Sequence, residues 1–148
     1  LVSAGLQGVK SILLLGYHGK LIKLAGGIFH THHYLADGRL EIFVAHGVKV
    51  GLETAILQQI LTCETTEQAL NFLKELDQSQ GSDWVNQVYA SISQTLEERT
   101  VNHLQKHTGK TVTIGSLLFA RDRSTIVISE TGKAILEQLL NSQAPQQA

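Results

Sequence analysis

The sequence is short of cysteine, of aromatic residues and of net charge, and each shortage excludes a class of function. A single cysteine, Cys63, rules out an internal disulfide and fits a protein of the reducing cytosol. Aromatic residues make up 5% of the chain, too few for a surface that stacks nucleic-acid bases. The formal net charge of −1 gives no general attraction to nucleic acid or to an anionic membrane, so any anion must be recognised locally. No apolar run reaches the roughly 18 residues that a membrane span needs.

The rest of the composition is that of one globular domain. The 148 residues, 43% of them hydrophobic, are enough to bury a core. Because the chain starts at Leu1 and shows no charged-then-apolar leader, we expect it to be part of a longer cytoplasmic protein. We place a single α/β domain at residues 1–140 and a disordered, glutamine-rich tail at residues 141–148. The sequence leaves the oligomeric state, monomer or homo-oligomer, open.

The spacing of apolar residues predicts a small Rossmann-like α/β sheet flanked by helices, with a C-terminal β-hairpin and a final helix. A solid apolar run at 9–15 is typical of a strand buried on both faces, and strands at 111–120 and 125–129 are predicted to form the hairpin. Thr65-Thr66-Glu67-Gln68 has the pattern of a capping box. Three strands are few for so many helices, so either short strands escape the pattern or another part of the protein packs against a small sheet. Helices are predicted at 1–8, 20–29, 39–50, 52–61, 65–76, 84–107 and 130–140.

Two glycines after the first strand place a candidate ligand site where strand and helix join. Gly16 and Gly19 interrupt the apolar run, and helix-period apolar residues resume after Lys20. Such a join leaves backbone N–H groups pointing at a crevice beside a helix N-terminus, where open α/β sheets bind ligands. The nucleoside-triphosphate motif is absent, because Leu14 stands where it needs glycine and Leu21 where it needs a hydroxyl, and the dinucleotide motif fails as well. The turn is therefore either a ligand loop of another kind or a sharp bend that needs glycine dihedrals alone.

Charged side chains near this join offer binding groups for an anion. Lys20 and Lys23 lie one helical turn apart and can face one carboxylate ligand, although a solvated helix face explains Lys23 as well. Asp37, Arg39 and Glu41 alternate in charge around a helix start. Arg39 can fork onto a ligand carboxylate while an acidic neighbour holds it, or Asp37 can cap the helix and Glu41 favour its dipole. We expect this helix start and the glycine turn to converge on one ligand cleft.

Histidines gather between these two features, at positions 30, 32 and 33, with His46 on the following helix. A zinc site would use such residues, but the helical His-Glu-x-x-His spacing and a second cysteine are both missing. Hydrogen bonding and proton transfer suit them better, because the pKa of histidine lies near neutral pH. We therefore predict no protein-bound metal, and we assign His33 to the surface. Four more polar residues receive structural roles only: His103 and His107 at a solvated helix end, and Arg121 and Arg123 in a turn.

Together these residues resemble the CbiD family, the cobalt-precorrin-5B C1-methyltransferases of anaerobic cobalamin biosynthesis. The family pattern is a strand, Gly-His-x-Gly-Lys, a helix, Asn-Thr-His, then Ala-Asp-x-Arg-x-Glu and Ala-Ala-His. The sequence departs from it at Tyr17, where the family has histidine, and at His30, where the family has asparagine. The resemblance is dense over residues 6–50, and the family's Gly-Tyr-Thr-Thr-Gly-Thr-Cys segment is absent, so the chain resembles the C-terminal domain alone. The matching positions are Gly16, Gly19, Lys20, Thr31, His32, Asp37, Arg39, Glu41 and His46.

The resemblance implies an S-adenosyl-L-methionine-dependent methyltransferase that acts on C1 of a cobalt-chelated precorrin. Cobalt then belongs to the substrate, and the partner of this chain is the N-terminal domain of the same protein. It implies proton transfer by His32 as the catalytic residue, and contact with the methyl donor by Gly16, Gly19 and Lys20. An alternative is a non-catalytic docking domain that binds corrinoid or cofactor while the missing domain performs the chemistry. Substrate binding is assigned to His18, Thr31, Asp37, Arg39, Glu41 and His46.

Overall fold

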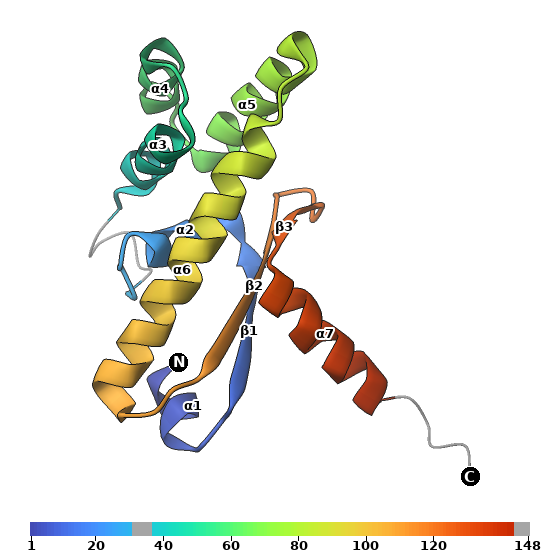
Figure 1. The fold of residues 1–148 in the computed structure, drawn as a ribbon. Coiled ribbons are helices and arrows are strands. Elements are labelled where there is room, and N and C mark those ends of the chain that lie inside the picture. Colours follow the sequence, from blue (N-terminus) through green and yellow to red (C-terminus); the bar gives the residue numbers. More distant parts are fainter. Residues whose placement is uncertain (31–36, 144–148) are drawn as a thin grey trace.

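A computed structural model describes residues 1–30 and 37–143, which form a three-stranded sheet with helices on both faces (Figure 1). The strand order is β1-β2-β3, and no further strand occurs in these two ranges, so the sheet is indeed small. The predicted α/β class, with its C-terminal hairpin and final helix, is confirmed. The elements in chain order are α1 (Val2–Leu6), β1 (Ser11–Tyr17), α2 (His18–Ala25), α3 (Arg39–Val50), α4 (Thr54–Leu61), α5 (Thr66–Gln80), α6 (Trp84–Thr108), β2 (Thr113–Phe119), β3 (Thr125–Ile128) and α7 (Glu130–Ser142).

The strands β1 and β2 run parallel, although most of the helices lie between them in the chain. Ser11 pairs with Thr113 and Tyr17 pairs with Phe119, so both strands end together at one edge of the sheet. Parallel neighbours need a crossover connection, which α2 to α6 provide here. β2 and β3 form the predicted antiparallel hairpin.

The first strand starts and ends two residues later than its apolar run predicts. β1 continues through Gly16 and Tyr17, because both pair with the last residues of β2. Helix α2 then begins at His18 with no residue between the two elements. The glycine turn predicted at this join is therefore wrong: Gly16 is a strand residue, and Gly19 belongs to the first turn of α2.

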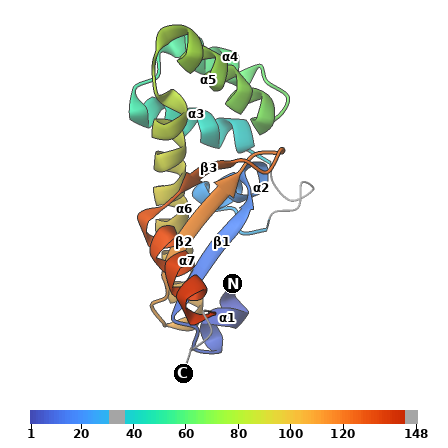
Figure 2. The same ribbon diagram turned by 90° about the vertical axis from the view of Figure 1, so that its right-hand side faces the viewer.

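Helices α6 and α7 cover opposite faces of the sheet (Figures 1 and 2). On β2, the Ser116 hydroxyl lies 2.7 Å from that of Ser93 on α6, whereas the neighbouring Gly115 meets Gly132 of α7. Adjacent strand residues point to opposite faces, so the two contacts place the helices on either side. A Cβ on Gly115 would lie 2.5 Å from the Gly132 backbone nitrogen. Only glycine permits α7 to approach the sheet this closely.

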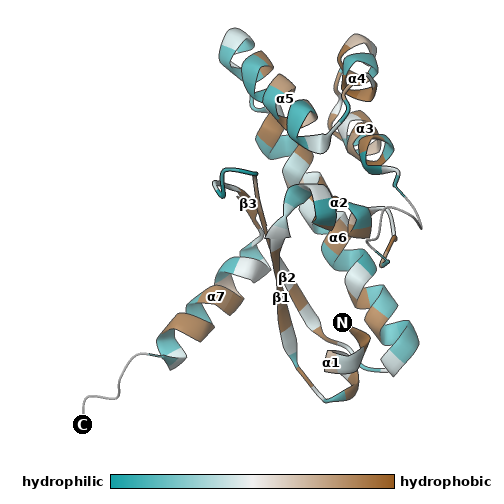
Figure 3. Cartoon of the chain, turned by 180° about the vertical axis from the view of Figure 1, so that it is seen from behind, coloured by the Kyte–Doolittle hydropathy of each residue, from teal (hydrophilic) through white to brown (hydrophobic). Residues whose placement is uncertain are grey.

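The main hydrophobic core lies where α6 meets the strands and the helices α2, α3 and α5. Figure 3 shows the strands in brown, the colour of apolar residues, and in the white of intermediate hydropathy, while the turn between β2 and β3 is teal, the colour of hydrophilic residues. The core is continuous from α6 to the helices above the strand ends, so the sheet and these helices form one packed unit. Its fully buried members include Ile22, Phe43, Ile60, Leu70, Leu73, Val88, Tyr89, Ile92, Leu96 and Leu118.

Helices α3, α4 and α5 lie together beyond the carboxyl ends of β1 and β2 (Figures 1 and 2). The start of α5 is fixed as its capping-box pattern predicts. The Thr65 hydroxyl oxygen accepts the backbone N–H of Gln68 at 3.2 Å, and the Gln68 side-chain oxygen accepts the N–H of Glu64 at 2.7 Å. This reciprocal pair holds the first turn of α5 close to the ends of the two strands.

The paired glycines of the second predicted helix end that helix instead of lying inside it. α2 stops at Ala25, and Gly27 has a φ of +76°. The N–H of Ile28 donates to the Lys23 carbonyl at 2.9 Å, the hydrogen bond of a helix that stops at a left-handed glycine. Gly26 packs against Ile42 of α3. The pair therefore serves a helix stop and a close helix–helix contact.

The last helix is longer than predicted. α7 continues through Asn141 and Ser142, which the sequence pattern assigns to the tail. The predicted disorder of residues 144–148 lies outside the described residues. In the described part of the chain, no helix combines the length and the apolarity that crossing a membrane requires.

Candidate functional site

Three helices begin beside the edge of the sheet where β1 and β2 end. α2 follows β1 directly, while α3 and α5 start on the two sides of one cavity. Gly19 of α2 lies against α5, because a Cβ there would be 2.7 Å from the Thr66 hydroxyl oxygen and 2.5 Å from Cε1 of Tyr17. Helix starts present unpaired N–H groups and the positive end of the helix dipole. Their convergence favours a negatively charged ligand at this edge of the sheet.

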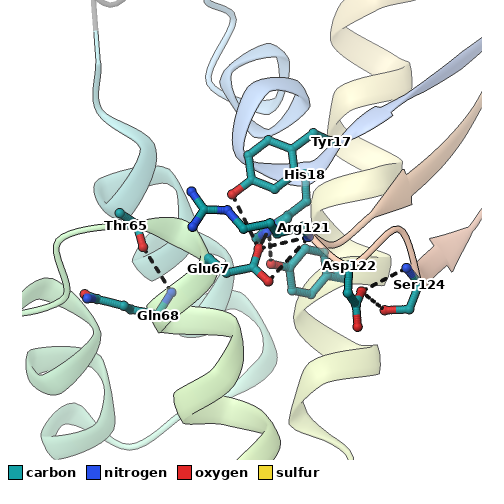
Figure 4. A network of polar contacts seen from close by, with 9 residues as sticks. Tyr17, His18, Thr65, Glu67, Gln68, Arg121, Asp122 and Ser124 are labelled. Carbon is teal, nitrogen blue, oxygen red and sulfur yellow. Dashed lines mark hydrogen bonds and ion pairs between the residues drawn. The ribbon is translucent and has the colours of Figure 1, made fainter.

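Glu67, in the first turn of α5, connects the ends of both strands (Figure 4). Its carboxylate lies 2.8 Å from Nε2 of His18, and it accepts the Tyr17 hydroxyl at 3.4 Å and the Arg121 backbone N–H at 3.3 Å. The other ring nitrogen of His18 lies 2.7 Å from the hydroxyl of Tyr89 on α6. His18 and Tyr89 are fully buried. One chain of polar contacts therefore joins α6, α2, α5 and the turn after β2.

Burial determines which side chains of this network of polar contacts carry a proton. It lowers the pKa of His18, although the hydrogen bond with Glu67 acts in the opposite direction. The ring is therefore neutral near pH 7 and carries one N–H. Burial also raises the pKa of Tyr89 well above its ordinary value, so its hydroxyl keeps its proton. We assign the histidine N–H to Nε2, which donates to the carboxylate, and the Tyr89 hydroxyl then donates to Nδ1. Both ring nitrogens are thus used inside the protein.

A forked ion pair stands at the start of α3. Nε of Arg39 lies 2.6 Å from Oδ1 of Asp37, and Nη2 lies 3.1 Å from Oδ2. The hydrogen bond from Arg39 lowers the pKa of Asp37. The N-cap residue is Gly38, with a φ of +69°, and not Asp37 as predicted. The Asp37 carboxylate nevertheless accepts the backbone N–H of Arg39, the first residue of the helix, at 3.5 Å, in addition to its contacts with the guanidinium. The predicted ion pair, in which Asp37 orients the Arg39 side chain, is present.

A cavity of about 160 Å³ opens between the starts of α3 and α5. Its walls run from Asp37 to Glu41 on one side and from Glu64 to Thr66 on the other. The Thr66 hydroxyl is buried and has no hydrogen-bond partner among the described residues. Space of this order holds a few waters or one polar arm of a ligand. Glu41 and Glu64 make the rim of this cavity acidic. The cavity therefore suits a neutral hydrogen-bonding group of a ligand better than a ligand carboxylate.

The comparison with known protein families decides the family. Residues 30–130 match the family described as CbiD, C-terminal domain. The chain belongs to the CbiD family. This confirms the resemblance carried by the motifs at residues 6–50.

The CbiD domain is also similar over nearly its whole length to named cyanobacterial proteins. It is 50% identical to the cobalt-precorrin-5B C(1)-methyltransferase of Cyanothece sp., over 94% of this chain and 37% of that protein. Identity is 51% to the protein of that name from Trichormus variabilis, over 94% of this chain and 38% of the relative. The Synechocystis sp. protein of the same name is 46% identical, over 93% and 36%. The chain thus spans little more than a third of these relatives, and no solved structure matches it.

The structure of the CbiD domain brings part of the predicted site together. Gly19 adjoins Thr66, which lines the cavity at the start of α3, but neither Gly16 nor Gly19 lines that cavity. A ligand cleft shared by the two segments therefore stays a prediction. Lys20 is exposed on the first turn of α2 and makes no hydrogen bond or ion pair in the described part of the chain. Gly16 lies in β1, one residue before the strand end. Three predicted residues line the cavity: Asp37, Arg39 and Glu41. Two predicted residues lie outside the described residues: Thr31 and His32.

Two predicted substrate-binding histidines are core residues in this domain. His18 is fully buried, and His46 is 3% exposed between α3 and α6, with Nδ1 2.7 Å from the Ser91 hydroxyl oxygen. Lys23, which the sequence suggests on a solvated face, is fully buried as well, because α2 is enclosed by α3, α5 and α6. Among the described residues, no three histidine, cysteine or acidic side chains gather in a group that could hold a metal ion.

Acid should destabilise the domain partly through His46. Burial, followed by the charges of Lys49 and Arg99, lowers its pKa to about 4. Because the unfolded chain takes up a proton near about pH 6.5 and the folded chain does not, this contribution is complete above that pH and is lost as the pH falls toward 4. We expect a loss of about 1 kcal/mol of unfolding free energy between about pH 7 and about pH 5.5.

Urea unfolding at several pH values measures this contribution of His46. His46→Asn keeps a polar group for Ser91 without a titrating ring, so it should flatten the pH dependence. His107→Asn, a matched control at an exposed histidine, should leave the dependence as in the wild type. An unchanged slope in His46→Asn would contradict the assignment.

The sequence pattern does not reveal Glu67 and Tyr89 as members of the site. Glu67 stands inside a capping box, whose local pattern accounts for an acidic residue without any distant partner. Its contacts with His18 and Arg121 join positions 49 and 54 residues away. Tyr89 lies on the buried stripe of α6, where only the need of a buried hydroxyl for a partner signals a polar contact.

Proposed function

We propose that this domain takes part in methyl transfer from S-adenosyl-L-methionine to C1 of cobalt-precorrin-5B in cobalamin biosynthesis. One observation carries the proposal: about half of the residues are identical, over nearly the whole chain, to proteins named for that reaction. The methyl donor and the precorrin are the substrates that this name implies, and cobalt enters with the precorrin. We place the reaction in the longer protein, of which this chain corresponds to the C-terminal part.

The geometry at the ends of β1 and β2 supports the binding of such an acceptor. A cobalt-precorrin is a flat, largely apolar macrocycle edged with carboxylates, so it needs an apolar wall and cationic or N–H donors at its rim. Arg39 is the first residue of α3, and Tyr17 immediately precedes α2. Transfer forms a carbon–carbon bond at C1 as the bond from sulfonium sulfur to methyl breaks and the thioether leaves. Alignment of the two reactants is then the main task of the protein.

The decisive experiment is a methyl-transfer assay with the full-length protein. Cobalt-precorrin-5B and S-adenosyl-L-methionine labelled in its methyl carbon should give a product that carries the label on C1. Nuclear magnetic resonance and mass spectrometry of the product would show the position and the mass gain. Absence of transfer from a folded protein that binds both substrates would contradict the proposed function.

We assign proton transfer in this reaction to His32, on the basis of the family resemblance alone. General acid–base groups contribute roughly a hundredfold or more to a rate. His32→Ala in the full-length protein should therefore lower kcat about a hundredfold with a smaller effect on KM. His33→Ala, the adjacent control, should keep the wild-type kcat. An unchanged kcat in His32→Ala would remove this histidine from the mechanism.

A second candidate is a docking domain that binds the corrinoid while the remainder of the longer protein performs the transfer. It is favoured by the direct passage of β1 into α2, which leaves no glycine loop for a cofactor at Gly16 to Gly19, and by the internal use of both His18 nitrogens. Calorimetric titration of this chain with S-adenosylhomocysteine and with cobyrinic acid separates the candidates. Binding of the corrinoid alone supports docking, whereas binding of S-adenosylhomocysteine places a donor site in this domain.

A further inference from the structure

A second cavity, of about 260 Å³, opens at the same edge of the sheet. It shares Tyr17 and Arg121 with the contacts of Glu67, whereas no residue of the predicted site lines it. Tyr17 and Phe119 line it as the last residues of β1 and β2. They are register partners, so their side chains leave the same face of the sheet next to each other. The cavity therefore has two neighbouring aromatic walls at the strand ends, where sheets of this kind bind ligands.

Two guanidinium groups complete the lining. Arg121 and Arg123 are exposed in the turn between β2 and β3, and neither side chain makes an ion pair or hydrogen bond within the described residues. Asp122 stands between them but is turned the other way, because its Oδ1 accepts the Ser124 backbone N–H at 2.9 Å. Figure 4 shows the Arg121 side chain extending toward Tyr17, while Asp122 points toward Ser124. The cavity thus has local positive charge on a chain whose net charge is −1.

The turn holds these arginines in a defined conformation. The Arg121 backbone N–H donates to Glu67 at 3.3 Å, and Arg123 N–H donates to the Ala120 carbonyl at 2.9 Å. Arg123 has a φ of +67°, a left-handed conformation that costs a residue with a side chain about 1 kcal/mol. In the described ranges no other residue except glycine has a positive φ. Such strain concentrates at binding sites, and a fixed turn loses little entropy when a ligand arrives.

We infer that Tyr17, Phe119, Arg121 and Arg123 form a binding site for the carboxylate-bearing edge of a planar macrocycle. The aromatic walls accept the flat apolar part, and the two guanidinium groups fork onto carboxylates beside it. A lone phosphate would meet the same cations but would leave the aromatic walls without a contact. The identity of the macrocycle as a cobalt-precorrin rests on the proposed function, whereas the recognition of a carboxylated corrinoid is tested independently.

The test compares two corrinoids that share one ring but differ in the charge of their peripheral groups. Cobyrinic acid carries free peripheral carboxylates, and its methyl ester has the same ring without them. In calorimetric titrations of the full-length protein, Arg121→Gln and Arg123→Gln should each weaken the binding of cobyrinic acid about tenfold, the scale of one charge-assisted contact. Both variants should bind the methyl ester as the wild type does. Arg99→Gln, a control at an exposed arginine of α6 outside the cavity, should bind both corrinoids as the wild type does.

The outcomes distinguish this inference from the proposed function. The inference would be overturned if the double variant, Arg121→Gln with Arg123→Gln, bound cobyrinic acid with wild-type affinity. It would also be overturned if the variants lost equal affinity for the acid and the ester, or if the wild-type protein bound neither corrinoid. Circular dichroism and thermal unfolding check that the exposed substitutions leave the fold intact. Failure of the proposed function has a different signature: the wild type transfers no methyl group, while the arginine-dependent preference for the acid over the ester persists.

Discussion

Replacing Glu67 with alanine should lower the free energy of unfolding by about 3 kcal/mol, more than a hundredfold in the folding equilibrium. The carboxylate receives the Nε2–H of fully buried His18, and the substitution removes the partner of that donor. The Tyr17 hydroxyl and the Arg121 backbone N–H lose their acceptor at the same time. Tyr89 then hydrogen-bonds to a ring that is no longer held from its other side.

Guanidinium chloride unfolding, followed by circular dichroism, measures this loss. Glu67→Gln retains one acceptor oxygen and the shape of the side chain, so it should cost about 1 kcal/mol. Glu41→Ala removes an exposed carboxylate from the first turn of α3 and should change stability by about 0.5 kcal/mol at most. If Glu67→Ala lowered the free energy of unfolding no more than Glu41→Ala does, the polar contacts through His18 would not contribute to stability.

Gly115→Ala should destabilise the protein by about 3 kcal/mol, because the new methyl group meets backbone and not a movable side chain. Its Cβ would lie 2.5 Å from the nitrogen and 2.6 Å from the Cα of Gly132, where α7 crosses β2. The contact can be relieved only by moving α7 outward, which also disturbs the Ser129 cap at its start. That hydroxyl accepts the N–H of Gly132 at 2.9 Å and that of Ser116 at 3.1 Å.

A second glycine provides the matched control for this substitution. Gly109 ends α6 with a φ of +67°, and nothing lies within 4 Å of the position of an added Cβ. Gly109→Ala therefore pays only for a left-handed alanine, about 1 kcal/mol. In thermal unfolding, the melting temperature of Gly115→Ala should be clearly lower than that of Gly109→Ala. Equal melting temperatures would mean that α7 is not seated on the sheet as described.

The parts of the fold that follow from local pattern were predictable, and the errors lie where glycine acts through packing. Apolar periodicity predicts the helices and the C-terminal hairpin, and the capping-box pattern at Thr65 predicts the start of α5, as the structure confirms. Gly16 and Gly19 suggested a turn, yet Gly19 is needed because Tyr17 and Thr66 leave no room for a Cβ. The sequence does not show whether a glycine is needed for close packing or for a turn of the backbone. Only the contacts in the folded structure distinguish the two cases.

The candidate site divides in the same way between local and distant interactions. Asp37 and Arg39 are two positions apart, so their pairing is visible in the sequence, and the structure contains it. His18 is different, because its partners Glu67 and Tyr89 come from helices far along the chain. The sequence pattern predicts that this histidine meets a ligand. In the structure His18 is buried between Glu67 and Tyr89 and has a structural role. No local spacing in the sequence indicates these two partners.

The parallel pairing of β1 with β2 bears on the order in which the protein is made and folded. Ser11 pairs with Thr113, so roughly a hundred residues must be synthesised before the first strand finds its neighbour. Until then the leucines of that strand have no sheet to join and are open to chaperones or to other nascent chains. Completion of the sheet therefore comes late, after the intervening helices have left the ribosome.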